Sequence, residues 1–520
     1  MNYFVNENIF SMNSGTEFSA AQRVMLFKKN KVPAQIVTRN YNPLMIDDVH
    51  RIGLEQKDVV NMYDYFQEIL DVAPKDVNVR YTEAIDKYQY HIDGVDPNES
   101  KIVYHGKTIG KVNIAPGTVG LVGSIEYYND MNTVVAKDIW DRRGFKSSTQ
   151  YFHPDGAFGP QVFYDRAGKP KIEITRMNVN GELRNTMYKL LDYQGRAWRF
   201  DTENEMFVFF MNEVVAAEPS VFMNELMLKH PGVLINDRPS LISEVAAVVG
   251  ARGKWQFLHS AHTYKPEQAG GLRNYVDYLQ PLFATHMNDF DGVMVPTVEQ
   301  KQEIDKFFHF KHVVVVPDSY AEPHKLVPAE KRDRNKIVYL GRVSPEKEPQ
   351  EAVKIFAKAK KDLPDLHLEF YGYSSDQSLD NSLKELIKKL EIEDAVHFNG
   401  YQNNDQLAKK LGDAAAVLST SSSEAFGMNV LQAMSFGVPV IGYQVKYGMK
   451  LVVKEGISGY LVPNGESQQG AKALVKLLTD KDKWVDMLES TYESSQKFNA
   501  AAAWQQWQAQ QAAVPNVFLK

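Results

Sequence analysis

The stretch Ser-Ser-Ser-Glu-Ala-Phe-Gly-Met-Asn-Val-Leu-Gln at residues 421–432 decides how the C-terminal part of this chain folds. One apolar run precedes it at 414–418, and a second follows at 438–443. Short apolar runs of this kind are typical of buried strands, so the pattern predicts strand, polar loop, short helix and strand. This is a βαβ unit of a parallel sheet, and ligands bind outside the carboxyl ends of its strands. The loop places the carboxylate of Glu424 there.

Gly427 opens the predicted helix, which covers 427–436. The first backbone N–H groups of a helix have no partner within it, and they favour an anion such as phosphate. The loop and the helix together therefore predict a site for a phosphate-bearing ligand beside a carboxylate.

Two cations extend this prediction. A strand predicted at 336–340 is followed directly by Gly-Arg-Val-Ser-Pro-Glu-Lys at 341–347. Arg342 and Lys347 therefore lie at the carboxyl end of a strand, where they suit a diphosphate, Arg by bidentate hydrogen bonds and Lys as a point charge. Taken alone, the pair is better explained as a solvated loop. With Glu424 in the same domain, we favour a sugar-nucleotide site.

The N-terminus predicts another βαβ unit, with buried strands at 2–5 and 34–38 and a helix at about 17–30. Its strand-to-helix turn contains Ser14, Gly15 and Thr16. Gly15 permits close approach of the backbone to a ligand, and Ser14 or Thr16 can cap the helix. An ordinary capped turn is an equal alternative.

Between residues 77 and 201 the hydrophobic pattern of the sequence differs from that of the rest of the chain. Short alternating segments are separated by turn signals such as Pro-Asp-Gly at 154–156 and Asn-Gly at 180–181. This pattern predicts an antiparallel meander inside an otherwise α/β chain. The block contains no cluster of catalytic type, so we expect it to be a binding or assembly surface.

Two histidines lie at the carboxyl end of a strand predicted at 255–259: His259 is its last residue, and His262 follows three residues later. Their spacing allows a metal site, but no third ligand is evident, and a polar contact at the end of the strand is the favoured interpretation.

Composition limits the class of protein. The chain has 520 residues, which suggests about three domains. It is 44% apolar and 24% charged, as expected of a soluble globular protein, and its net charge of −6 argues against a nucleic-acid partner. It has no cysteine, which excludes disulfides and thiolate metal sites. No signal peptide and no apolar run of about 20 residues is seen, so we expect a cytoplasmic enzyme.

The site residues carry a family resemblance. Arg342 with Lys347, and Glu424 followed eight positions later by Gln432, resemble the signature Arg-x4-Lys plus Glu-x7-Glu of the retaining GT-B glycosyltransferases of family 4. The segment Lys-Tyr-Gly at 446–448 is similar to the donor-domain pattern of that family.

Other features narrow the resemblance. The Ser14-Gly15-Thr16 loop, the internal β-rich insertion and the run at 161–165 resemble one subgroup. It holds the catalytic subunit of the bacterial Gtf protein O-glycosylation pair and the teichoic-acid α-glycosyltransferases. The resemblance covers essentially the whole chain.

The resemblance implies an α/β protein of the GT-B class, with two Rossmann-like domains facing a cleft and an antiparallel β-rich insertion in the N-terminal domain. The expected segments are 1–76 and 203–318 for the two parts of the N-terminal acceptor domain, 77–202 for the insertion, 319–498 for the nucleotide-sugar domain, and 499–520 for a C-terminal helix that packs back on the body.

The resemblance also implies roles for the residues. Arg342 and Lys347 would hold the diphosphate and neutralise the leaving group, so neither a metal nor another cofactor is expected. Glu424 would contact sugar hydroxyls, and His262 would touch the hexose from the facing domain. The implied donor-binding residues are Ser14, Gly15 and Thr16 near the phosphates, Tyr371, Tyr373 and Tyr401 around the base, the backbone of Phe426, Gly427, Met428 and Asn429, and Gln432 at the ribose.

Gln432 departs from the family pattern, which has a carboxylate there. An amide still offers one acceptor and two donors for ribose hydroxyls. Natural drift or an engineered change is favoured over lost activity, because Glu424, Arg342 and Lys347 all remain.

The resemblance therefore implies a retaining hexosyltransferase with UDP-glucose or UDP-N-acetylglucosamine as donor. Its expected acceptor is Ser or Thr, or a glycan on Ser or Thr, of a bacterial serine-rich surface protein. A GT-like partner subunit or a second copy would bind through the insertion, and any membrane contact would be peripheral. One alternative is α-glucosylation of poly(glycerol or ribitol phosphate), a polyanion for which a net charge of −6 is unfavourable. Another is a non-catalytic GT-like partner, which only Gln432 supports. The hexose, the acceptor and the oligomeric state stay open.

Overall fold

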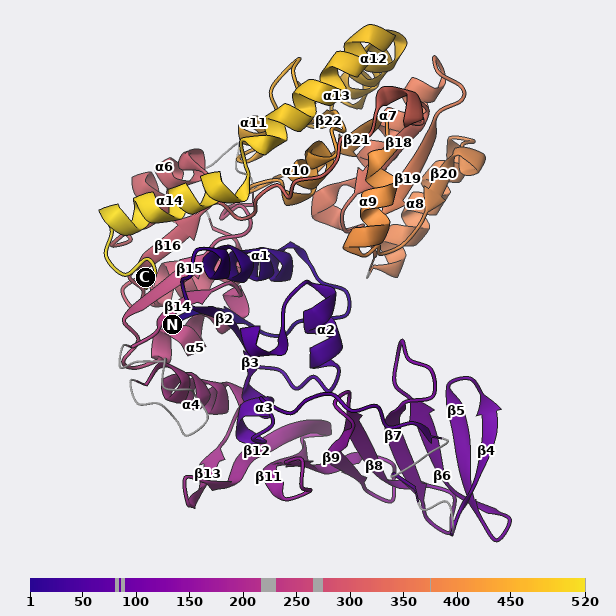
Figure 1. The fold of residues 1–520 in the computed structure, drawn as a ribbon, viewed down its shortest axis with the longest axis vertical. Helices are drawn as coiled ribbons and strands as arrows, with labels where there is room; N and C mark the ends of the chain where they lie inside the picture. Colours follow the sequence, from indigo (N-terminus) through magenta and orange to yellow (C-terminus); the bar gives the residue numbers. More distant parts are fainter. Residues whose placement is uncertain (80–83, 86–88, 217–230, 265–274, 375, 520) are drawn as a thin grey trace. The chain divides into compact units, whose positions relative to one another are not determined.

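The structure is a computed structural model that describes residues 1–79, 84–85, 89–216, 231–264, 275–374 and 376–519. Within these ranges the chain forms two parallel sheets and one antiparallel sheet (Figure 1). It divides into two compact units. The first comprises Met1–Ser11, Pro33–Leu234 and Glu244–Arg252, and the second comprises Met12–Val32, Ile235–Ser243 and Gly253–Lys520.

The first parallel sheet has seven strands in the order β17-β16-β15-β14-β1-β2-β3. The strands are β1 (Asn2–Asn6), β2 (Ala34–Thr38), β3 (Val59–Asn61), β14 (Val233–Asn236), β15 (Gly253–Phe257), β16 (Gly292–Val295) and β17 (Val313–Val315). The helices of this part of the chain are α1 (Gly15–Lys29), α2 (Met45–Arg51), α3 (Met62–Phe66), α4 (Glu203–Val215), α5 (Ile242–Ala247) and α6 (Val298–Phe307). Because β1 and β2 pair in parallel with α1 between them in sequence, the predicted N-terminal βαβ unit is confirmed.

The insertion is a ten-stranded sheet in which strands adjacent in sequence are also adjacent in space. The strands are β4 (His91–Asp96), β5 (Glu99–Tyr104), β6 (Lys107–Ile114), β7 (Val122–Tyr128), β8 (Val134–Asp141), β9 (Phe145–Phe152), β10 (Phe158–Tyr164), β11 (Pro170–Val179), β12 (Glu182–Tyr193) and β13 (Arg196–Phe200). All the described pairs are antiparallel, which confirms the predicted meander. Ile102, Val112 and Ile125 form part of its apolar core.

The second parallel sheet has six strands in the order β20-β19-β18-β21-β22-β23. The strands are β18 (Lys336–Leu340), β19 (His367–Tyr371), β20 (Val396–Phe398), β21 (Ala416–Ser419), β22 (Val440–Tyr443) and β23 (Gly459–Val462). Its helices are α7 (Pro349–Lys360), α8 (Gln377–Lys389), α9 (Asn404–Gly412), α10 (Met428–Ser435), α11 (Met449–Val452), α12 (Ser467–Thr479) and α13 (Lys481–Gln496). The run from β21 through α10 to β22 is the βαβ unit predicted around 421–432.

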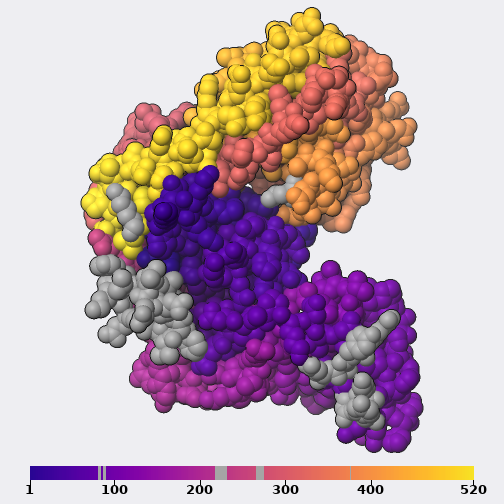
Figure 2. All heavy atoms as spheres, viewed as in Figure 1, coloured from indigo at the N-terminus to yellow at the C-terminus, as the bar shows by residue number. Residues whose placement is uncertain are grey.

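The last helix of the described residues is α14 (Ala500–Ala513), which belongs to the yellow, C-terminal part of the molecule in Figure 2. The ring of Trp507 is fully buried, and those of Trp507 and Trp504 lie 5.2 and 5.3 Å from that of Phe27 in α1. Aromatic packing therefore attaches this last helix to α1. None of the helices in the described ranges combines the length and the apolar character needed to cross a bilayer.

Candidate functional site

The strand order of the second sheet reverses between β18 and β21, which pair directly in parallel. In open α/β sheets this reversal is where ligands bind, outside the carboxyl ends of the strands. The loop after β18 carries Arg342 and Lys347, and the loop after β21 carries Glu424. Packing of the sheet therefore brings the loops that carry these three sequence-predicted residues to one edge.

Backbone contacts join these two loops. The Thr420 hydroxyl donates to the carbonyls of Lys347 and Glu348 at 3.1 and 3.0 Å. The N–H and the hydroxyl of Ser422 both donate to the carbonyl of Glu346, at 3.0 and 3.1 Å. The loops hold each other in place, so their side chains are presented as one surface.

Lys347 and Glu424 form an ion pair between Nζ and Oε1, and their side chains are only 20% and 9% exposed. The Ser421 hydroxyl donates to the same carboxylate oxygen at 2.7 Å. The structure therefore places Lys347, one of the two predicted cations, in direct contact with the predicted carboxylate of Glu424. Partial burial strengthens their attraction relative to that of a surface pair.

Arg342 lies nearer to solvent, with 48% of its side chain exposed. Its guanidinium donates to Glu346 Oε1 at 2.8 Å, an oxygen that also accepts from the Ser344 hydroxyl at 2.7 Å. Sequence reasoning singled out neither Glu346 nor Ser421. Both lie inside the quoted motifs, but no spacing rule marked them.

Two helix N-termini approach each other beside these loops. Gly427, at φ +91° in the left-handed region, precedes α10, and the Asn429 side chain donates to the Leu340 carbonyl at the end of β18, at 2.6 Å. A Cβ added to Gly15, the first residue of α1, would lie 3.6 Å from Met428 Sδ. Of the two cap candidates, Ser14 is the N-cap residue of α1, and its backbone N–H donates to Glu17 Oε2 at 2.8 Å. Both helix ends suit an anion.

Gln432 lies one turn beyond Met428 on α10 and is half-buried. Within the described residues, its side-chain amide forms no hydrogen bond. Its contact with a ribose stays a prediction.

The three tyrosines expected around a base differ in placement. The ring of Tyr371 is 2% exposed and belongs to the core, with Lys336 Nζ 5.8 Å from its centroid. Tyr373 and Tyr401 are half-buried, and their rings meet edge-on at 6.2 Å. Contact of these three tyrosines with a base stays a prediction.

His262 is 1% exposed, and burial lowers its pKa to about 4 despite the nearby carboxylate of Glu303, so the ring is neutral at pH 7. Its Nδ1 lies 3.4 Å from the hydroxyl of Tyr447, a residue of the loop after β22. The expected contact of His262 with the donor sugar stays a prediction.

His259 has a different role from the metal ligand weighed above. Its Nδ1 lies 2.7 Å from Asp318 and its Nε2 3.0 Å from Asp237. Burial opposes the charged form, but these two carboxylates raise the pKa of His259. Across the described part of the chain, no group of three or more acidic or histidine side chains is arranged to hold a metal ion.

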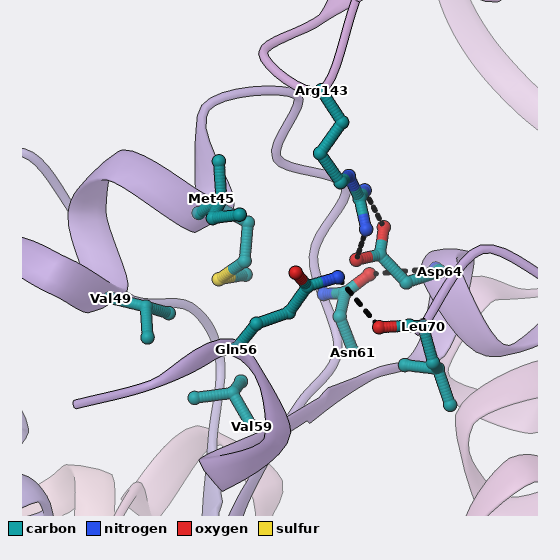
Figure 3. Close-up of a pocket in the computed structure, with 9 residues that line it drawn as sticks. Met45, Val49, Gln56, Val59, Asn61, Asp64, Leu70 and Arg143 are labelled. Atoms are coloured by element: carbon teal, nitrogen blue, oxygen red, sulfur yellow. Dashed lines mark hydrogen bonds and ion pairs between the residues drawn. The ribbon is translucent and has the colours of Figure 1, made fainter. Parts of the chain in front are cut away.

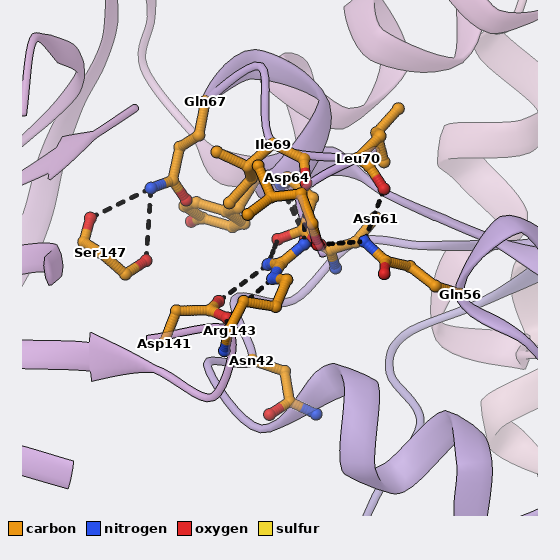
Figure 4. Close-up of polar contacts among 12 residues, drawn as sticks. Asn42, Gln56, Asn61, Asp64, Gln67, Ile69, Leu70, Asp141, Arg143 and Ser147 are labelled. Carbon is orange, nitrogen blue, oxygen red and sulfur yellow. Dashed lines mark hydrogen bonds and ion pairs between the residues drawn. The ribbon is translucent and has the colours of Figure 1, made fainter. Parts of the chain in front are cut away.

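A separate polar cluster lies in the first unit, at a small cavity (Figures 3 and 4). Buried Arg143 donates to Asp141 at 2.7 Å, to Asp64 at 3.0 Å and to the Ile69 carbonyl at 2.9 Å. Burial raises the pKa of Asp64 to about 6, although Arg143 opposes the rise. The bonds of Arg143 to Asp64 and to Ile69 join α3 and the residues after it to the turn between β8 and β9, so we interpret the cluster as structural.

Comparison with known proteins bears on the family of the chain. Residues 321–494 match the family Glycosyl transferases group 1, so this part of the chain is a GT-B glycosyltransferase domain. The chain is 25% identical over 503 residues to the UDP-N-acetylglucosamine–peptide N-acetylglucosaminyltransferase GtfA subunit of Streptococcus agalactiae, covering 92% of each chain. It is 20% identical to a poly(ribitol-phosphate) alpha-N-acetylglucosaminyltransferase of Staphylococcus aureus, covering 93% of each.

A solved structure shares the whole fold. The pneumococcal O-GlcNAc transferase GtfA, crystallised with UDP and GlcNAc, superposes with a TM-score of 0.82 at 21% identity, covering 99% of each chain. The GT-B fold with its β-rich insertion, expected from the sequence, is thereby confirmed.

Proposed function

We propose that this glycosyltransferase moves N-acetylglucosamine or glucose from a UDP-sugar to Ser or Thr, or to a glycan on Ser or Thr, of a bacterial serine-rich surface protein. The observation that carries the proposal is the ion pair between Lys347 and Glu424, which lies where the strand order of the group 1 domain reverses. A cation for the leaving diphosphate and a carboxylate for sugar hydroxyls are what transfer from a sugar nucleotide requires.

The donor diphosphate would lie against Arg342 and Lys347, with the N-termini of α1 and α10 directed at its oxygens. Glu424, oriented by Ser421, would accept hydrogen bonds from sugar hydroxyls. Tyr373 and Tyr401 would contact the base, and Gln432 the ribose.

The reaction retains configuration in this proposal. The bond from the anomeric carbon to the phosphate oxygen breaks while the acceptor oxygen attacks from the same face. The departing phosphate oxygen takes the acceptor's hydroxyl proton, so no protein nucleophile is required. Lys347 and Arg342 stabilise the negative charge on the departing UDP, the task that a divalent metal performs elsewhere. We therefore propose a metal-independent reaction.

The acceptor and partner are inferred from the relatives. The streptococcal protein is named a peptide N-acetylglucosaminyltransferase and a subunit, which supports a polypeptide acceptor and a second subunit here. The ten-stranded insertion, with exposed side chains such as Tyr151 and Met177, is the surface we propose for that partner. A cytoplasmic location is part of the same proposal.

Transfer to a poly(ribitol or glycerol phosphate) is the second candidate, and the name of the staphylococcal relative favours it. A polyanionic acceptor requires a basic groove, whereas this chain carries a net charge of −6. Polypeptide transfer is therefore the main proposal.

One assay tests these proposals together. The full chain is incubated with radiolabelled UDP-N-acetylglucosamine or UDP-glucose, with a Ser-rich peptide or a teichoic polymer, with and without EDTA. We expect label on the peptide in both conditions, and loss of label in Lys347→Ala and Glu424→Ala. Lys384→Ala and Glu385→Ala, two exposed residues of α8, are matched controls. If neither donor gives any transfer or hydrolysis, the enzymatic proposal is refuted. If activity is lost when EDTA is added, the metal-independent mechanism is refuted.

A further inference from the structure

Glu303, on α6, contacts two consecutive residues of the loop after β22. The Tyr447 hydroxyl donates to its Oε2 at 2.7 Å, and Lys446 Nζ forms an ion pair with its Oε1. The side chain of Glu303 is 16% exposed and that of Lys446 25%, while Tyr447 is 2% exposed. The three groups therefore form a largely buried, charge-assisted contact, the strong class of hydrogen bond.

The same loop holds the backbone of Glu424. The Glu424 N–H donates to the Lys446 carbonyl at 2.9 Å, and the Glu424 carbonyl accepts from Tyr447 and Gly448 at 2.6 and 2.8 Å. Contact is so close that a Cβ on Gly448 would lie 2.2 Å from the Phe426 carbonyl oxygen. Displacement of this loop must therefore displace the backbone that carries the Glu424 carboxylate.

We infer that Glu303 is a positioning residue for Glu424, acting through Lys446 and Tyr447. A helix of the first parallel sheet thereby sets the carboxylate that receives the donor sugar. This inference rests on the proposed function of Glu424. It assigns a task to a glutamate that lies on α6, outside both the 341–347 and the 421–432 stretches, and matches no pattern in them.

The direction of the hydrogen bonds makes the contact specific. A carboxylate only accepts, so the single Tyr447 proton is committed to Glu303. The phenol oxygen is left as an acceptor, and His262 Nδ1, 3.4 Å away, faces it favourably only as an N–H donor. Glu303 from α6 and Lys446 from the loop are the charged groups that act on this ring. With the Tyr447 proton on Glu303, this contact suits the Nδ1–H tautomer of His262.

The test compares affinity for UDP with affinity for the UDP-sugar. Glu303→Ala is expected to lower kcat/KM for the UDP-sugar about tenfold or more, the effect of losing a hydrogen bond to a charged group. Affinity for UDP alone should change less than about twofold, because Arg342 and Lys347 hold the diphosphate from another loop. Asp305→Ala is the matched control, because Asp305 lies on the same helix and its carboxylate forms an ion pair with Lys301 one turn away.

A mutant cycle and an activity-independent readout complete the design. Adding Glu303→Ala to the double variant Lys446→Met/Tyr447→Phe should cause no further loss, because the partners through which Glu303 acts are already absent. Amide hydrogen exchange of Glu424, Tyr447 and Gly448 should accelerate in Glu303→Ala and not in Asp305→Ala.

Each outcome decides the inference. A Glu303→Ala enzyme with unchanged kcat/KM, beside an inactive Glu424→Ala, overturns it and leaves the proposed function intact. Equal losses of affinity for UDP and for the UDP-sugar in Glu303→Ala also overturn it, because they indicate that the substitution disturbs the whole donor site and not the position of Glu424. If the wild-type chain transfers no sugar, the proposed function fails. The link between Glu303 and the backbone of Glu424 is then decided by amide exchange alone, and unchanged exchange at Glu424 in Glu303→Ala overturns it.

Discussion

Replacing Lys347 by methionine removes the ammonium at the candidate site while keeping a side chain of similar length. In the structure that ammonium forms an ion pair with Glu424, whose side chain is 9% exposed. Ser421 is the other side chain that contacts this carboxylate in the described residues. Two effects are expected, namely loss of charge stabilisation on the departing diphosphate and an unpaired, largely buried carboxylate.

The catalytic effect should be the larger one. Removing one preorganised group that stabilises developing charge costs about 10²- to 10³-fold in kcat, which corresponds to about 3–4 kcal/mol of transition-state stabilisation. The unpaired Glu424 should lower the free energy of unfolding by about 1–3 kcal/mol, because the carboxylate keeps one hydrogen bond and some solvent. Lys347→Arg should not restore full rate, since a planar fork cannot replace a point charge.

The assay is steady-state transfer from radiolabelled UDP-sugar to the Ser-rich peptide, with thermal unfolding measured on the same samples. Lys384→Met serves as the control for loss of an exposed lysine. A Lys347→Met enzyme with normal kcat and only a raised KM would falsify the reasoning, because it would mean that Lys347 binds ground state and transition state equally.

Three further predictions concern the rest of the molecule. Arg143→Met should lower the free energy of unfolding of the first unit by about 3–5 kcal/mol in urea titrations, because it leaves two buried carboxylates unpaired; a loss below about 1 kcal/mol would contradict this. The pKa of His262 lies near 4 in the folded chain and near 6.5 when unfolded. Between these pH values the unfolded state binds more protons, so the free energy of unfolding falls as the pH drops through them, by about 3 kcal/mol in total. His262→Phe should flatten this pH dependence, measured by thermal melts at pH 4.5 and 7. Gly448→Ala should abolish transfer while the protein stays folded by circular dichroism, since its Cβ would meet the Phe426 carbonyl; near-normal activity would show that the loop can relax.

Local pattern determined the elements and much of the site. Strands of a parallel sheet are buried on both faces, so they appear as continuous apolar runs, and those at 336–340 and 414–418 were placed from composition alone. Because carboxyl ends of parallel strands share one edge, Arg342, Lys347 and Glu424 could be predicted to lie near each other. The turn signals between 77 and 201 likewise predicted the meander.

Tertiary structure decided which strands are neighbours and which side chains meet. The pairing of β18 with β21 depends on contacts between residues some eighty positions apart, which no local period encodes. Tyr371 stands at a strand end as a ligand contact would, yet its ring packs into the core, because the side of the sheet on which it lies is set by packing. Glu303 is an unremarkable charge on an amphipathic helix until the fold brings Lys446 and Tyr447 to it. The sequence thus determined the elements and the chemistry at each strand end, whereas partners distant along the chain were decided by the fold, because only packing brings such groups within hydrogen-bonding distance.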